Sequence, residues 1–169
     1  MAETVEDSEG VFGRILALAC SGLALAGGAV LLGIVGLTVV SILLRELTGH
    51  PIPGDYELVE VGCAVAVFAF LPYCQLAGGN VFVAFATAWA PSRLQAALDV
   101  LSRLAYAAIA ALLAWRLTLG GMDLRTYGET TMVLGMPVWP TFLPIVPSLA
   151  LLSIACLYTA AESLRKGPA

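Results

Sequence analysis

The sequence predicts an all-α integral membrane protein with four transmembrane helices, and two observations about its charges support this. Of 169 residues, 60% are hydrophobic and only 12% are charged, about half of the roughly 25% found in soluble domains. Charges are absent from residues 15–44, 61–92 and 130–161, which are runs of 30, 32 and 32 residues. A helix needs about 20 apolar residues to cross a bilayer. The charge shortage also excludes a disordered chain and a nucleic-acid-binding protein, which needs a basic surface.

The four helices are expected at about residues 14–46, 57–77, 94–119 and 136–162. Arg14 and Arg45 border the first apolar run. The third region is apolar except for Asp99, Arg103 and Arg116. Because a long basic side chain near a helix end can reach the membrane surface, these charges are compatible with a spanning helix.

The second apolar run is longer than one helix requires. Pro72 removes a backbone donor, and the Gly-Gly-Asn sequence at residues 78–80 is a strong stop signal. We therefore expect the helix to end near Leu76. The remaining apolar residues, 81–89, predict a short interfacial segment on the cytoplasmic face, before the next helix.

The fourth helix begins in a proline-rich sequence. Pro137 and Pro140 flank Trp139, a residue suited to the membrane interface, and Pro144 and Pro147 follow closely. An irregular or kinked start is therefore expected for this helix.

Basic residues near the helix ends predict that both termini lie in the cytoplasm (N-in/C-in). The predicted cytoplasmic side holds five of them (Arg14, Arg93, Arg103, Arg165 and Lys166), and the opposite side holds three (Arg45, Arg116 and Arg125). The resulting organisation is an acidic cytoplasmic tail at residues 1–12, a single four-helix transmembrane domain at 13–165 and a short tail at 166–169.

The first helix carries a stripe of small residues on one face. Its members recur at steps of four and three: Gly22, Ala26, Ala29, Gly33 and Gly36. Small residues let helix backbones approach closely inside a membrane. The stripe is therefore a candidate helix-packing face, either within this chain or against a partner membrane subunit.

Catalytic, cofactor-binding and metal-ligating residues are not predicted. The single histidine, His50, lies in a polar loop, and the four cysteines lie in apolar segments without a C-x-x-C pair. The predicted helix centres also lack the ionisable residues that line most transport pathways. We therefore expect neither an enzyme nor a subunit that carries the substrate by itself.

Most of the polar residues gather in two loops that the topology places outside. Candidates for ion pairs or partner docking there are Arg45, Asp55, Glu57, Glu60, Arg116, Arg125 and Glu129. Asp55 is expected to cap the second helix, with Glu57 in its first turn near the positive end of the helix dipole. Glu60 is expected to pair with Arg45 or Arg116. The alternative is that this face docks a soluble partner.

Several stretches resemble the small membrane subunit of the tripartite ATP-independent periplasmic (TRAP) transporters. They are residues 51–60 (PIPGDYELVE), 71–76 (LPYCQL), 79–83 (GNVFV), 91–99 (PSRLQAALD), 128–131 (GETT) and 134–140 (LGMPVWP). The similarity extends over about residues 12–165, with four helices in the same order.

The resemblance implies a role in sodium-coupled uptake of an organic acid, a carboxylate or a sulfonate, across the bacterial inner membrane. The implied partners are a large elevator-type membrane subunit, which holds the substrate and sodium sites, and a periplasmic solute-binding protein, besides the phospholipid of the bilayer. The small subunit would brace the scaffold of the large one and help to dock the binding protein. Two alternatives stay open: an accessory four-helix subunit of another membrane complex, and a small quinone-linked thiol oxidase, which would need a loop cysteine pair.

Overall fold

The computed structural model describes residues 11–77 and 92–166, and within them the chain forms four long helices. These are α1 (Val11–Thr48), α2 (Asp55–Leu76), α4 (Ser92–Tyr127) and α5 (Phe142–Lys166). A short 3₁₀ turn, η1 (Trp139–Thr141), precedes α5. All four helices are long and apolar enough to cross a membrane. The predicted all-α, four-helix membrane fold is therefore confirmed.

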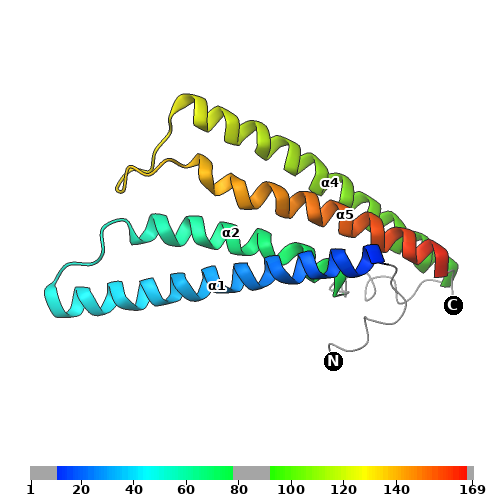
Figure 1. Cartoon of the computed structure of the whole chain (residues 1–169), viewed down its shortest axis with the longest axis horizontal. Coiled ribbons are helices and arrows are strands. Elements are labelled where there is room, and N and C mark those ends of the chain that lie inside the picture. Colours follow the sequence, from blue (N-terminus) through cyan, green and yellow to red (C-terminus); the bar gives the residue numbers. More distant parts are fainter. Residues whose placement is uncertain (1–10, 78–91, 167–169) are drawn as a thin grey trace.

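The helices form two antiparallel hairpins that lie side by side (Figure 1). Helix α1 packs on α2, α2 packs on α5, and α5 packs on α4, so the order in space is α1, α2, α5, α4. The two inner helices, α2 and α5, have 22 and 25 residues, whereas the two outer helices, α1 and α4, have 38 and 36. At about 1.5 Å per residue, each outer helix exceeds the roughly 30 Å of hydrocarbon, so it must tilt or project into water.

The hairpins converge at one end of the molecule and diverge at the other (Figure 1). We call the end where α1 begins and α5 ends the closed end. We call the other end, with the connections at residues 49–54 and 128–138, the loop end. Because α1 begins and α5 ends at the same end, the domain has the even number of crossings that the sequence predicts. The orientation of that end in the membrane stays a prediction.

Glycines set the close contact between α1 and α2. An added Cβ on Gly27 would lie 2.8 Å from the Cβ of Ala69, and one on Gly62 would collide with Ile34. Close backbone approach at small residues is a usual way to associate helices in lipid. The α1–α2 hairpin is therefore built on a glycine from each helix.

Two apolar clusters join the hairpins. At the closed end, Leu16 and Cys20 of α1 pack with Ala155 of α5, and Leu76 of α2 adds to them. A larger cluster centres on α5 and includes α4 residues, with part of α2 packed against it; its buried members are Ala107, Ala110, Ile145, Leu149, Leu152 and Cys156. Helix α5 therefore holds the structure together.

Helices α4 and α5 differ from the predicted bounds. We expected the third helix to end near residue 119, but Gly120 and Gly121 are helical and α4 continues to Tyr127. It ends at Gly128, whose φ of 65° lies in the left-handed region that glycine favours. Gly121 stays in the helix at a place where an added Cβ would lie 3.2 Å from the Cβ of Phe142.

The fourth helix begins at Phe142, later than the predicted residue 136. Residues 129–138 instead form a tight loop with an isolated bridge between Thr130 and Pro137, and η1 then leads into α5. The expected irregular start is therefore present. The predicted interfacial segment at residues 81–89 lies outside the described residues.

Candidate partner-docking surfaces

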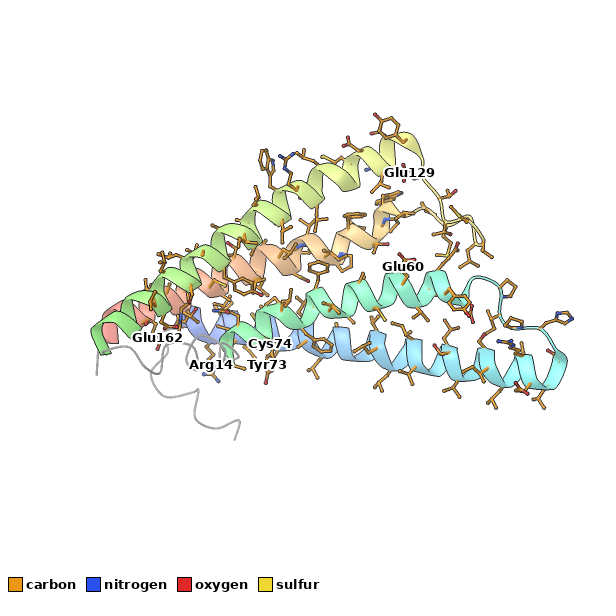
Figure 2. The ribbon with its side chains drawn as sticks, turned by 180° about the vertical axis from the view of Figure 1, so that it is seen from behind. Arg14, Glu60, Tyr73, Cys74, Glu129 and Glu162 are labelled. Atoms are coloured by element: carbon orange, nitrogen blue, oxygen red, sulfur yellow. The ribbon has the colours of Figure 1, made fainter. Side chains whose placement is uncertain are left out.

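The charged residues that the sequence singles out are spread over the loop end and the adjoining part of α4. Arg45 lies in the last turn of α1, Asp55 and Glu57 in the first turn of α2, and Arg125 in the last turn of α4. Glu129 follows α4 directly, and Glu60 lies one turn further along α2 (Figure 2). Arg116 lies nine residues before Arg125, about 14 Å along the helix axis.

Asp55 does not cap α2 in the way we expected. The N-cap position is Gly54, which has a φ of 77°, and it makes no side-chain cap bond. The Asp55 carboxylate instead accepts a hydrogen bond from Ser41 Oγ of α1 at 2.7 Å and one from the backbone N–H of Tyr56 at 2.9 Å. Ser41 Oγ also accepts the N–H of Ile52 at 3.2 Å. Asp55 and Ser41 therefore fix the α1–α2 connection.

Glu57 joins α2 to the loop between α4 and α5. Its Oε1 accepts the backbone N–H of Val133 at 2.7 Å, and its Oε2 accepts that of Leu134 at 3.0 Å. The side chain of Leu134 covers Gly54, where an added Cβ would collide with it. Glu57 lies in the first turn as predicted, but its partner is the backbone of a loop 76 residues away. Together with the contact of Leu134 on Gly54, it joins the two hairpins at the loop end.

Glu60 does not pair with either predicted arginine. It is exposed and lies on the side of α2 that faces the second hairpin at the loop end (Figure 2). Among the described residues, neither Arg45 nor Arg116 comes within ion-pair distance of it. The expected Glu60 ion pair is therefore absent from the described residues. Arg116 belongs to α4, on the far side of α5, and Arg45 lies one turn beyond Ser41, which contacts the start of α2.

Two arginines of α4 instead lie over tryptophan rings. The guanidinium of Arg116 lies 5.5 Å from the ring centre of Trp115, and that of Arg125 lies 5.2 Å from the ring centre of Trp139. Such cation–π contacts stabilise the position of a guanidinium without a carboxylate partner. Trp139 comes from η1, so the Arg125 contact links the end of α4 to the start of α5.

The small-residue stripe of α1 lies on the outside of the chain. Its five residues (Gly22, Ala26, Ala29, Gly33 and Gly36) are all exposed. Added Cβ atoms on Gly22, Gly33 and Gly36 would meet nothing within 4 Å. Among the described residues, α1 turns a different face toward α2, the one with Gly27, and the stripe stays exposed. Packing against a partner stays a proposal.

The sequence reasoning missed a polar cluster at the closed end. Gln75 Nε2 of α2 donates to Thr159 Oγ1 of α5 at 3.3 Å, and Arg103 of α4 donates to the backbone oxygen of Thr159 at 3.1 Å. Arg103 also pairs with Asp99, one turn away, at 2.8 Å. The sequence did contain a signal for this cluster, because Gln75 and Thr159 are polar residues within apolar runs. The cluster joins three helices.

The described residues offer no evident reaction centre. No group of three or more His, Cys, Asp or Glu side chains in residues 11–77 and 92–166 could hold a metal ion. All four cysteines are free thiols, Cys20 and Cys156 buried and the other two exposed. What the described chain presents to its surroundings is mainly apolar helix surface with polar groups at the helix ends, an arrangement suited to association with other proteins and lipid.

Comparison with known proteins gives one match. A family described as tripartite ATP-independent periplasmic transporters, DctQ component, matches residues 34–166. This segment includes α2, α4, α5 and the last part of α1. Neither the curated proteins nor the solved structures contain a match.

Proposed function

This chain belongs to the DctQ family, the small permease component of the tripartite ATP-independent periplasmic transporters, and we propose that it braces the large membrane subunit of such a transporter. Membership makes the chain a multi-pass membrane component of a transport system that also contains a large subunit and a binding protein. The open small-residue stripe on α1 is the observation that supports a bracing role.

The stripe suits close packing against another membrane helix. Its five residues lie within an arc of about 80° around α1, and none is covered by the described part of this chain. In lipid, helices gain little from burying apolar side chains, so contact at small residues supplies most of the attraction. We therefore place a helix of the large subunit against this stripe.

A matched pair of substitutions tests this packing. Gly33→Leu adds a bulky side chain to the stripe. Gly28→Leu adds the same side chain at a position about 120° around the helix axis from the centre of the stripe. Added Cβ atoms at both positions meet nothing within 4 Å of the chain. We expect Gly33→Leu to reduce copurification of the large subunit in mild detergent, while Gly28→Leu retains it. Equal copurification of the large subunit by both variants would contradict the proposal that the stripe lies in the interface.

Docking of the periplasmic binding protein is the second part of the proposal, and it assumes the N-in/C-in orientation. The loop at residues 129–138, held by Glu57, then lies on the periplasmic side, and its tip residue Met132 is fully exposed. Val133 beside it is 63% exposed. A hydrogen-bonded loop with an apolar tip has little conformational entropy left to lose on binding, which favours this loop as a contact for the binding protein.

We further propose that the transporter couples sodium to the uptake of a carboxylate or sulfonate, with both sites on the large subunit. This part rests on the resemblance. The test is copurification of the full chain with its partners, followed by uptake of candidate acids into vesicles with and without a sodium gradient. Uptake that is equal with and without the gradient would contradict sodium coupling. Recovery with a different membrane complex, lacking a binding protein, would favour an accessory role instead.

A further inference from the structure

A groove lies between α4 and α5 at the loop end. Its volume is about 310 Å³, at the lower end of the range for small-molecule sites. Apolar side chains from both helices form most of its lining, among them Leu117, Met122, Phe142, Leu143 and Val146. Met122 and Leu143 are 63% and 64% exposed, so the groove opens on the surface that the helices present to lipid.

A cation lies at one end of this groove. Arg125 and Trp139 both line it, with the guanidinium 5.2 Å from the ring centre. Arg125 has no carboxylate partner within the described part of the chain. Tryptophan is enriched where the hydrocarbon meets the lipid headgroups. We therefore expect the Arg125 end of the groove to lie at headgroup level and the Val146 end to face the hydrocarbon layer.

The rest of the lining has little to offer a water-soluble ligand. Thr118 is the one hydroxyl-bearing residue of this lining, and its hydroxyl already donates to the backbone oxygen of Ala114 at 2.7 Å. A small organic anion would leave most of its polar groups without partners there, which is costly. A ligand with one anionic group and a long apolar chain can contact both Arg125 and the apolar lining of the groove.

We propose that this groove binds an anionic phospholipid, with its phosphate on the Arg125 guanidinium and one acyl chain along the apolar lining. Guanidinium and phosphate form strong, charge-assisted hydrogen bonds. The Trp139 ring holds the guanidinium in place, so little side-chain entropy is lost on binding. This proposal does not depend on the transport function.

Quenching of tryptophan fluorescence by lipids with brominated acyl chains tests the proposal. The full chain with Trp89→Phe and Trp115→Phe keeps Trp139 as its one tryptophan, which is excited at wavelengths that tyrosine does not absorb. In phosphatidylcholine vesicles, brominated phosphatidylglycerol is compared with brominated phosphatidylcholine. We expect phosphatidylglycerol to bind about fivefold more strongly, the effect of one basic residue near an anionic lipid.

The matched control is the other arginine–tryptophan contact, that of Arg116 with Trp115. In a chain that keeps Trp115 as its one tryptophan, quenching measures lipid near Arg116, which does not line the groove. We expect Trp115 to show a clearly weaker preference between the two lipids than Trp139, because Arg116 does not line the groove that holds the acyl chain. Arg125→Gln should abolish the preference of Trp139 for phosphatidylglycerol, and Arg116→Gln should preserve it. Val146→Phe fills the groove and should therefore weaken the quenching of Trp139 by both lipids.

Several outcomes would overturn the proposal. They are equal quenching of Trp139 by the two lipids, the same preference at Trp115, and a preference that survives Arg125→Gln. Removal of the preference by soluble glycerol phosphate would show an anion site that does not need the acyl chain. If the single-tryptophan chains do not fold, native mass spectrometry of the otherwise unaltered chain and of Arg125→Gln decides: equal numbers of retained phosphatidylglycerol molecules contradict the proposal.

Discussion

At the closed end, Gln75, Arg103 and Thr159 join α2, α4 and α5 through hydrogen bonds set among apolar side chains, and the Leu16 cluster adds α1. At the loop end, the hairpins diverge, and the Glu57 carboxylate joins α2 to the backbone of a loop (Figure 1). The first arrangement fixes helices against one another, whereas the second fixes a loop on a helix end. We infer that the closed end determines the stability of the domain and the loop end determines the shape of its docking surface.

The largest expected effect on stability comes from side-chain packing, which we compare between the centre of α5 and its start at the loop end. Leu152→Ala removes a side chain that is 1% exposed at the centre of α5, and we expect the free energy of unfolding to fall by about 2 kcal/mol. Leu143→Ala, near the start of the same helix, removes one that is 64% exposed, with an expected loss below about 0.5 kcal/mol. Unfolding of the full chain in mixed micelles measures both. Equal losses would contradict the idea that α5 is held mainly at its inner part.

A smaller effect is expected for the polar cluster of the closed end. Arg103→Gln removes the bond to the Thr159 backbone oxygen and the ion pair with Asp99. Hydrogen bonds between membrane helices contribute modestly, so we expect a loss of about 1 kcal/mol. Arg116→Gln, an exposed position on the same helix, is the control and should leave unfolding unchanged. If both variants unfold alike, the cluster does not stabilise the domain.

The smallest effect on stability, and the sharpest test of the comparison, is expected at Glu57. Glutamine has one acceptor oxygen instead of two and carries no charge, so Glu57→Gln cannot accept the two amides on separate oxygens as Glu57 does. We expect unchanged unfolding of the domain but several-fold faster hydrogen exchange at the Val133 and Leu134 amides. Glu60→Gln, three residues along α2, should change neither. Unaltered exchange in Glu57→Gln would show that the loop is ordered without this carboxylate.

The three charge-free runs, together with the largely apolar residues 94–119, were sufficient to predict the number of helices. The bounds of α1 and α2 were predicted to within a few residues. The runs did not predict which faces turn inward, because a membrane helix is apolar all round and its periodicity does not distinguish protein from lipid. The stripe containing Gly33 was therefore a candidate for internal packing, whereas the structure uses Gly27 and Gly62.

The loop end was also only partly predictable. Opposite charges suggested an ion pair for Glu60, but α1 and α4 hold the arginines at the two edges of the row. For Glu57, the partner is a pair of backbone amides, which carry no signature in the sequence. In the hydrogen-bonded loop between Thr130 and Pro137, the local signal is Gly135, whose φ of 62° lies in the left-handed region that glycine favours.

The order of the helices in space has a consequence for biosynthesis. Helix α2 is complete early, but the Thr159 hydroxyl that Gln75 binds is made 84 residues later. Helix α4 is also made before the helix on which it packs. Until α5 is made, the first hairpin and α4 therefore lack the helix on which both of them pack.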